Sequence, residues 1–510
     1  MSDVEIASKG LSEGKVGMFS AAIIGISCIA PAYTLSGALG PTASEVGDHL
    51  PAILLVGFVP MLLVAIGYKE LNASMPDSGT TFTWATRAFG PVLGWLGGWG
   101  LLAATILVLS NLAGIAVDFF YLMLSQIMHK PEIAELTHNV PINVATCFVF
   151  VVIAALISYR GLDTTKSVQY ALVGFQFAVL ILFSCMALWK AHNGQAWDAK
   201  EFSWEWFNPL GVGSFSAFAA GVALSVFIYW GWDVVLTMSE ETEGCSSTPG
   251  KAATLTILII VVLYQLIAVA TLSYAGVGDG QYGLGNQAIQ ANIFGELATP
   301  IMGGLAILMS LAVLGSSAAS LQSTFIGPAR TMLAMGFYGA LPKKFANISP
   351  KFQTPGFATF VAAVVAFAFY AVMRVISEAV LWDTITALGM MVCFYYGMTA
   401  FACVWYFRKG WFSSVGSFFA KFLSPLVGGA LLLTFFFQTS YDAMDPSYGS
   451  GSEIFGVGLV FMLGVTLFAL GAISMALTWW KNPAFFCGQT LTRGLPSDKM
   501  ITVDEVLKLD

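Results

Sequence analysis

The sequence predicts an all-α integral membrane protein with twelve transmembrane helices, and three observations carry this prediction. Of the 510 residues, 57% are apolar and only 10% are charged, whereas soluble globular chains average about 25% charged residues. The apolar residues gather in runs of roughly 20 or more, the length that a helix needs to cross the hydrocarbon core. They do not alternate with the period of two that a membrane β-barrel requires.

Twelve stretches fit this description, and the loops between them hold most of the charges. The expected spans are 16–45, 50–71, 89–125, 140–158, 167–190, 214–239, 252–277, 299–333, 356–373, 379–405, 422–440 and 454–479. They divide the chain into five parts: a tail (1–14), spans one to five (15–192), spans six to ten (214–405), spans eleven and twelve (422–479) and a second tail (480–510).

The loops fit the positive-inside rule when the N-terminus is placed in the cytoplasm. Only Lys130, Lys190, Lys200 and Arg374 then fall outside, so 18 of the 22 basic residues lie on the inner side. A span missed or added midway would move every later loop to the opposite side and destroy this bias. We therefore expect a multi-pass protein of the plasma or inner membrane with both termini cytoplasmic.

The inventory of reactive side chains disfavours an enzyme. The four histidines (His49, His129, His138 and His192) all fall in outer loops, which excludes a histidine proton relay within the membrane. The seven cysteines form no CxxC pair, so no zinc site or disulfide framework is indicated. With a net charge of −7 and no basic run, nucleic-acid binding is also disfavoured. No cofactor is expected apart from a coupled ion.

Two spans contain interruptions at corresponding positions. Pro31 lies in span one, and because proline lacks an N–H and clashes with the preceding turn, the helix is expected to break near residues 27–31. Span six contains Gly231 and Asp233 at a similar depth. Paired interruptions in two halves indicate an inverted-repeat transporter; a pair of ordinary membrane-helix kinks is the alternative. An acid in mid-membrane is a functional candidate by default.

Three separated motifs resemble the amino acid–polyamine–organocation permeases, and the resemblance spans roughly residues 15–410. The motifs are Pro76–Trp84 with Phe89-Gly90-Pro91, then Phe227–Asp233 with Glu240-Glu241, and finally Arg330, Gly339, Leu341-Pro342 and Thr354-Pro355. The resemblance implies a five-plus-five inverted repeat of the leucine-transporter type, with broken helices 1 and 6 and two extra C-terminal helices. It also implies alternating-access transport of a small amino acid or related amine, either ion-coupled or by exchange.

The resemblance also implies a substrate site at the two breaks. Backbone amides of span one would bind the substrate's carboxylate, and carbonyls of spans one and six would bind its ammonium. An aromatic side chain of span six would close the site. The residues at the matching positions are Ser27, Cys28, Ile29, Ala30, Pro31, Ala32, Phe227, Tyr229, Trp230 and Gly231. Trp232 and Asp233 stand at a gating or proton-coupling position, although Asp233 could instead cap the second half-helix.

The coupling ion stays open between H⁺ and Na⁺. Proton-coupled members often carry a lysine in span five, where this chain has Phe175 and Gln176. Ser316, Ser317 and Ser320 in span eight could coordinate sodium, but small residues equally suit close helix packing. Similarly, Thr105, Ser110 and Asn111 in span three are either substrate contacts or interhelix hydrogen bonds. Asp118 and Asp383 are expected in wet positions near the outer span ends.

Several other functions remain as alternatives. A polyamine or organic-cation carrier is the nearest of them, and a nutrient sensor on a transporter scaffold is a further one. A channel would require rings of like charges or carbonyls along a pore, which the few acids within spans do not supply. The expected partners are a small-molecule amino acid substrate and the lipid bilayer; the identity of the substrate cannot be read from the sequence.

Overall fold

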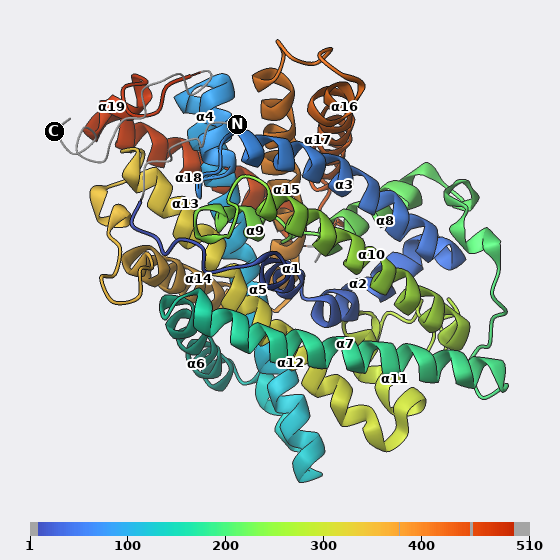
Figure 1. Ribbon diagram of the computed structural model, residues 1–510. Coiled ribbons are helices and arrows are strands. Elements are labelled where there is room, and N and C mark those ends of the chain that lie inside the picture. Colours follow the sequence, from blue (N-terminus) through green and yellow to red (C-terminus); the bar gives the residue numbers. More distant parts are fainter. Residues whose placement is uncertain (1–8, 377, 449–451, 494–510) are drawn as a thin grey trace.

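The computed structural model describes residues 9–376, 378–448 and 452–493, and it is almost entirely helical (Figure 1). Among these residues, ten helical stretches are long and apolar enough to cross a membrane, and Phe215–Ile228 is a shorter apolar helix. One such stretch, Met18–Ser74, contains the predicted span 50–71 and all but the first two residues of the predicted span 16–45. The all-helical class is confirmed, while the count of twelve and the inverted repeat stay predictions. Of the two predicted tails, residues 1–8 and 494–510 lie outside the described residues.

The first part of the chain contains one helix that the sequence did not predict. Its elements are α1 (Met18–Ile29), α2 (Pro31–Val46), η1 (Gly47–His49), α3 (Leu50–Ser74), α4 (Thr81–Phe89), α5 (Pro91–Met128), η2 (Pro131–His138), α6 (Val140–Tyr159) and α7 (Leu162–His192). The short helix α4 was not predicted. It is separated from α5 because Pro91 can begin a helix but cannot continue one from the preceding turn.

The middle of the chain is more segmented than predicted. Its elements are η3 (Trp204–Phe207), η4 (Pro209–Gly211), α8 (Phe215–Ile228), α9 (Val234–Thr237), η5 (Ser239–Glu241), α10 (Thr248–Ala275), η6 (Gln290–Asn292), α11 (Ile293–Met302), η7 (Gly303–Leu305), α12 (Ala306–Thr324), α13 (Ile326–Phe337), η8 (Lys343–Ala346), α14 (Gly356–Ile376) and α15 (Glu378–Tyr406). The predicted span 299–333 is therefore three helices. The junction of α12 and α13 follows Thr324. In a continuous helix the N–H of residue 328 would donate to the Thr324 carbonyl, but Pro328 has no N–H.

The last part begins and ends with short elements around two long helices. They are α16 (Val415–Phe418), the π-type turn η9 (Phe419–Leu423), α17 (Ser424–Asp442), β1 (Glu453–Ile454), β2 (Val457–Gly458), α18 (Leu459–Lys481) and α19 (Pro483–Phe486). The predicted span 454–479 was wrong at its start, since β1 and β2 form a small antiparallel hairpin. Its turn residues Phe455 and Gly456 both have positive φ, as two-residue hairpin turns commonly require.

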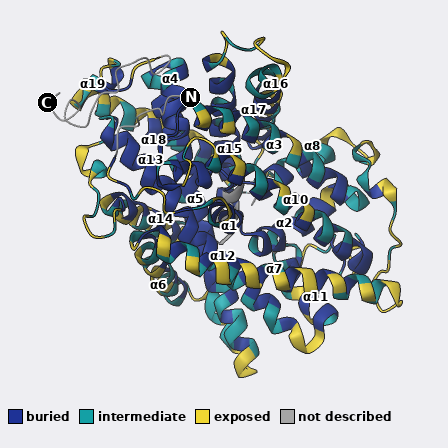
Figure 2. Ribbon diagram, in the orientation of Figure 1, coloured by how far each residue is buried: buried dark blue, intermediate teal, exposed yellow. Residues whose placement is uncertain are grey.

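Burial separates a central group of helices from a peripheral one. In the most apolar 18-residue stretch of α5, 89% of the residues are buried, compared with 22% in the corresponding stretch of α6 and 17% in that of α18. Figure 2 shows the buried residues at the centre of the molecule and the exposed ones at its margins. Large apolar side chains such as Phe148, Phe360 and Trp480 are exposed on peripheral helices. Surfaces of this kind suit contact with lipid rather than water, in agreement with a membrane protein.

Candidate functional site

The first predicted break lies at Ala30, within the expected range 27–31. Ala30 has φ 55° and ψ 62°, a left-handed conformation that is uncommon for a residue other than glycine. Its N–H donates to the carbonyls of Ile26 and Ser27, which ends α1. Pro31 then occupies the first position of α2, where a missing N–H costs nothing. The span is thus two half-helices rather than one bent helix.

The second break separates α8 from α9 and contains Gly231. Residues 229–233 form turns between Ile228, the last residue of α8, and Val234, the first of α9. Gly231 has φ 112°, a backbone conformation that side chains strongly disfavour. A glycine at this position is therefore a requirement of the break itself.

The two breaks meet in space. A Cβ atom built on Gly231 would lie 3.0 Å from the carbonyl carbon of Cys28 and 3.1 Å from its oxygen. Because the close atoms on Cys28 include backbone, this approach leaves no room for a side chain. The structure therefore brings Cys28 and Gly231, the centres of the two predicted segments, into direct contact.

Hydroxyl groups satisfy the carbonyls that the breaks release from helical hydrogen bonding. Ser320 Oγ on α12 donates to the Cys28 carbonyl at 2.9 Å, and Tyr264 OH on α10 donates to the Ile228 carbonyl at 2.9 Å. Within α2, Thr34 Oγ1 lies 2.5 Å from the Ile29 carbonyl oxygen. A freed carbonyl without a partner would be costly in a membrane interior. These hydroxyls therefore stabilise the open backbone at both breaks.

A stripe of hydroxyls along α12 lies against the first break. Besides Ser320, Ser316 Oγ accepts from the Tyr33 N–H at 3.4 Å, and Ser323 Oγ lies 3.2 Å from Ser27 Oγ. Thr324 Oγ1 lies 3.3 Å from the Cys28 sulfur. Ser317 differs, because its hydroxyl donates to the Val313 carbonyl of its own helix at 2.9 Å. Sequence reasoning missed Ser323 and Thr324, although the i, i+4, i+8 spacing of residues 316, 320 and 324 was visible.

Asp233 is held by two adjacent tyrosines of α15. Tyr396 OH donates to Asp233 Oδ1 at 2.8 Å and Tyr395 OH to Asp233 Oδ2 at 3.1 Å. The indole N–H of Trp230 in turn donates to Tyr395 OH at 2.6 Å. Asp233 occupies the position before α9, but its side chain makes no capping hydrogen bond there. The capping alternative is therefore wrong, and the tyrosine pair is a contact that the sequence did not reveal.

The remaining aromatic residues of the second break are buried. Tyr229 OH donates to the Leu54 carbonyl of α3 at 3.1 Å. The Trp232 ring packs against Tyr68 and Tyr396, with ring centroids 5.0 and 5.1 Å apart. Phe227, in contrast, is only partly buried. Phe227 is thus the less tightly packed aromatic residue of this segment, and it lies in the chain beside the closely packed Tyr229 and Trp232.

The three polar residues predicted in span three are placed differently from one another. Thr105 lies near the broken span, because a Cβ built on Gly327 would be 3.9 Å from its methyl group and 4.0 Å from Val234. Ser110 Oγ lies 2.9 Å from the Ala366 carbonyl oxygen of α14. Asn111 Nδ2 donates to Thr384 Oγ1 of α15 at 3.1 Å. The interhelix interpretation thus describes the bonds of Ser110 and Asn111, while their role toward a substrate stays untested.

The two acids expected in wet positions differ. Asp383 is 1% exposed, whereas Asp118 is only partly buried and accepts a short hydrogen bond from Thr137. The expectation failed for Asp383 because hydropathy places a residue along a helix but does not say which way its side chain faces. Asp233 is thus not the only acid enclosed by the helices.

A buried ionic cluster lies at one end of the helix bundle. It consists of Lys9, Asp77, Glu240, Glu241 and Arg330. Lys9 Nζ lies 2.8 Å from Asp77 Oδ2 and 2.5 Å from Glu240 Oε1, while Arg330 forms a close ion pair with Glu241. All five side chains are at most 8% exposed. The cluster therefore connects the start of the chain, the α3–α4 loop, the end of span six and α13.

The segment 9–16, which we call the N-terminal strap, carries Lys9 into this cluster. The Lys15 N–H donates to the Glu241 carbonyl at 2.8 Å, and the Glu243 N–H donates to the Val16 carbonyl at 3.0 Å. Tyr338 OH also donates to Asp77 Oδ2 at 2.8 Å. The strap therefore lies across the end of span six rather than extending away from the bundle as a free tail.

The charges of the cluster reinforce each other. Burial alone would raise the pKa of Asp77, but the Lys9 ammonium and hydrogen bonds from Lys9, Thr83 and the Gly79 N–H hold that pKa below its ordinary value. Burial alone would lower the pKa of Lys9, whereas Asp77 and Glu240 raise it above its ordinary value. Lys9 and Asp77 are therefore both charged at neutral pH.

Comparison with known proteins gives a consistent result. The family model described as amino acid permease matches residues 16–441. The branched-chain amino acid permease BcaP of Bacillus subtilis is 26% identical over 354 residues, which cover 68% of this chain and 72% of the relative. The methylthioribose transporter of the same species is 25% identical over 371 residues (70% and 75%). The low-affinity putrescine importer PlaP of Escherichia coli is 22% identical over 338 residues (65% and 69%).

Proposed function

The chain belongs to the amino acid permease family, and from this premise we propose that it is a secondary active transporter that moves a small amino acid by alternating access. The relatives are transporters rather than enzymes, so the expectation that this chain is not an enzyme is confirmed. The observation that carries the proposal is the contact between the two helix breaks at Cys28 and Gly231. We further propose that the fold is a five-plus-five inverted repeat with two additional helices.

The chemistry of the breaks suits a zwitterion. The N-terminus of α2 follows Ala30, and the first N–H groups of a helix have no partner within it and carry the positive end of its dipole. This end would bind the substrate's carboxylate at residues 27–32. The ammonium would lie toward the carbonyls of the same break and the carboxylate of Asp233. Phe227, the partly buried aromatic residue, would close the site.

The buried ionic cluster supports a gating role. Opening that end of the bundle would separate Lys9 from Asp77 and Glu240 and leave buried charges without partners, which is strongly unfavourable. The cluster would therefore hold that end closed while the site opens to the other side. The bias of basic residues toward this side supports a cytoplasmic location for the cluster and for both termini.

Two routes of ion coupling have support in the residues around the breaks. Asp233 would carry a proton, since it is the acid at the second break and its two partners, Tyr395 and Tyr396, are both hydroxyls. Alternatively, Ser316, Ser317 and Ser320 would contribute to a sodium site between spans one and eight, where Ser320 already contacts the Cys28 carbonyl. Exchange without a coupling ion is the third possibility that transport assays must separate.

A second candidate substrate class follows from the same carboxylate. A buried carboxylate that accepts hydrogen bonds from the hydroxyls of Tyr395 and Tyr396 would also favour a polyamine or organic cation. The relatives include permeases named for branched-chain amino acids and for putrescine, so the family accommodates both kinds of head group. Side-chain selectivity would come from the aromatic residues 227–232.

A ligand screen followed by transport assays tests the proposal. Purified protein is first screened by thermal shift against the twenty amino acids and common polyamines, and the hits are then measured by uptake into proteoliposomes. We expect stabilisation and saturable uptake for at least one small amino acid. Stabilisation by polyamines alone would favour the second candidate, and binding without any uptake or counterflow would favour a sensor and contradict the transporter.

A further inference from the structure

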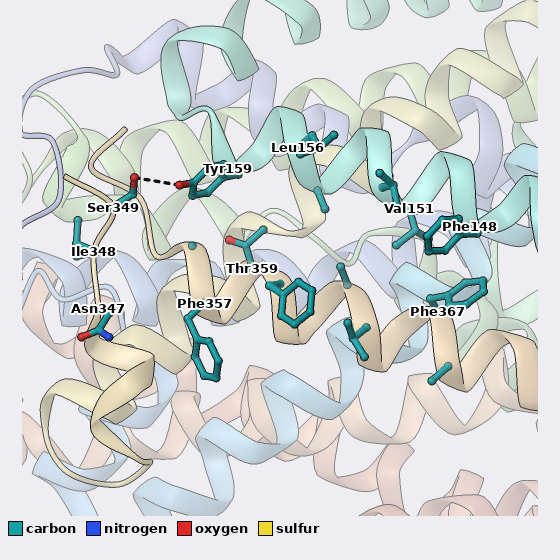
Figure 3. Close-up of a pocket in the computed structure, with 17 residues that line it drawn as sticks. Phe148, Val151, Leu156, Tyr159, Asn347, Ile348, Ser349, Phe357, Thr359 and Phe367 are labelled. Atoms are coloured by element: carbon teal, nitrogen blue, oxygen red, sulfur yellow. Dashed lines mark hydrogen bonds between the residues drawn. The ribbon is translucent and has the colours of Figure 1, made fainter. Parts of the chain in front are cut away.

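An open apolar groove runs between the peripheral helices α6 and α14. Its volume is about 750 Å³, and the side chains that line it come mainly from the facing sides of the two helices (Figure 3). Phe148 and Phe367 lie toward one end, and Tyr159 lies at the other. The groove opens outward, since the lining residues Leu156 and Phe360 are 56% and 64% exposed. In a membrane this groove faces lipid chains.

The Tyr159 end of the groove is polar and firmly built. Tyr159 OH and Ser349 Oγ lie 3.2 Å apart, and this pair marks the mouth in Figure 3. Thr354 Oγ1 donates to the Tyr159 carbonyl at 2.7 Å. These bonds attach the loop between α13 and α14 to the end of α6. The groove therefore has an apolar body and one fixed polar mouth.

The length of the groove matches one leaflet of a bilayer. Phe148 and Tyr159 are eleven residues apart in one helix, which corresponds to about 16 Å at the helical rise. Half of a hydrocarbon core is about 15 Å thick. A single acyl chain with its head group at the mouth would therefore extend along the whole apolar body.

Basic residues adjoin the mouth along the chain. Arg160 directly follows Tyr159, and the adjoining loop carries Lys343, Lys344 and Lys351, with no acidic residue between positions 340 and 360. Lys351 Nζ lies 5.2 Å from the centre of the Phe352 ring, which in turn packs on Tyr159 with 5.2 Å between ring centroids. Basic groups at a membrane surface attract anionic lipid head groups. A basic mouth of this kind would favour an anionic head group, which the apolar body by itself would not select.

We propose that this groove binds one anionic phospholipid, with an acyl chain along α6 and α14 and its phosphate at the Tyr159–Ser349 mouth among Arg160, Lys344 and Lys351. The site is separate from the helix breaks, so it does not depend on the identity of the transported substrate. It adjoins the N-terminal strap, because Ile348 at the mouth lies 3.7 Å from a Cβ built on Gly10. A bound lipid would thus contact the loop that supports the ionic cluster.

Native mass spectrometry of the full chain tests the proposal. The purified protein is incubated with phosphatidylglycerol or phosphatidylcholine of identical acyl chains. We expect one phosphatidylglycerol retained per chain under conditions that remove phosphatidylcholine. The triple variant Arg160→Gln, Lys344→Gln, Lys351→Gln should bind phosphatidylglycerol about 10- to 100-fold more weakly. A matched variant, Arg408→Gln, Lys409→Gln, Lys481→Gln, removes the same charge elsewhere and should retain the lipid as wild type does.

A second variant tests the groove without changing charge. Ala363→Trp fills the apolar body from α14 and should also abolish retention, with folding checked by a cooperative thermal transition. Equal retention of both lipids, equal loss in the two triple variants, or a lipid still bound to Ala363→Trp would each overturn the proposal. Two further outcomes would also overturn the proposal. Displacement of the lipid by soluble glycerol 3-phosphate would indicate a simple anion site, and a dimer that forms without bound lipid would indicate that a second copy of the chain covers the groove.

Discussion

Gly231 lies against the backbone of Cys28, so closely that a Cβ on the glycine would come within 3.0 Å of the Cys28 carbonyl carbon. This one contact joins the interruptions of two spans that are about 200 residues apart in the sequence. The two breaks can approach this closely because Gly231 has no side chain at the point of contact. A substitution at this contact is therefore the most direct test of the site.

Substitution of Gly231 by alanine should disrupt the site. The methyl group would clash with Cys28, and the φ of 112° is strained for any residue with a Cβ. We expect a loss of about 1–3 kcal/mol in stability and a larger proportional loss of uptake. The matched control is Gly174→Ala on α7, where an added Cβ meets nothing within 4 Å. The stability of both variants is measured by thermal unfolding, and their activity by uptake into proteoliposomes. Equal stability and equal uptake of the two variants would contradict the assigned contact.

Replacement of Asp233 by asparagine should separate binding from coupling. The amide keeps the shape, and its one oxygen can still accept from one of the two tyrosines Tyr395 and Tyr396, while its NH2 group can only donate to the other hydroxyl oxygen. It cannot release or take up a proton at physiological pH. We expect pH-driven uptake to disappear while substrate still stabilises the protein in a thermal-shift assay. If uptake of the variant responds to a pH gradient as wild type does, Asp233 is not the proton carrier.

The serines of α12 can be distinguished by a pair of alanine variants. Ser320→Ala leaves the Cys28 carbonyl without its hydroxyl donor, which should cost about 1–3 kcal/mol. Ser317→Ala removes a bond within its own helix and should cost less. If these serines hold sodium, wild-type uptake should follow a sodium gradient and Ser320→Ala should need more sodium for half-maximal rate. Equal uptake in choline buffer would remove the sodium role.

Neutralising Lys9 should destabilise the buried ionic cluster. Lys9→Gln leaves Asp77 and Glu240 buried without their cation, a change that costs about 3–5 kcal/mol. Lys166→Gln is the control, because Lys166 pairs with the exposed Asp163 and surface pairs contribute about 0–1 kcal/mol. Thermal unfolding of both variants gives the comparison. A Lys9→Arg variant that restores stability would show that the charge, rather than the packing of the side chain, is required.

The ion pair of Lys9 and Asp77 also predicts how the stability of the fold depends on pH. Since the pKa of Asp77 is lowered, its contribution is fully present above the ordinary value of about 3.9 and is lost as the pH falls through the lower folded value. The raised pKa of Lys9 makes its contribution complete below about 10.4 and lost at still higher pH. The difference in unfolding temperature between wild type and Asp77→Asn should therefore be constant from about pH 5 to 9 and shrink below about pH 4. A change in this difference between pH 6 and 8 would contradict the assignment.

The sequence by itself determined the features that depend on local chemistry. Apolar runs predict membrane helices, and Pro31 favours a helix start because it lacks an N–H, so the all-helical class and the break near residues 27–31 were predictable. Proline alone does not decide a break, since Pro41, Pro60 and Pro300 lie inside helices. The errors of the sequence-based prediction also concern local features. Helix α4 was not predicted, the predicted span 299–333 is three helices, and the last membrane helix begins after a hairpin. Each involves a short turn that mean hydropathy does not register.

Only the tertiary structure decided which polar groups meet. Tyr395 and Tyr396 bind Asp233 from more than 160 residues away, and Lys9 reaches Asp77 and Glu240 from a segment that looked like a free tail. Hydropathy is unchanged by how helices rotate or pair, so it places Asp383 along a span without showing that it is buried. The breaks are written in the sequence; their contact at Cys28 and Gly231 depends on the packing of two spans, which no local pattern specifies.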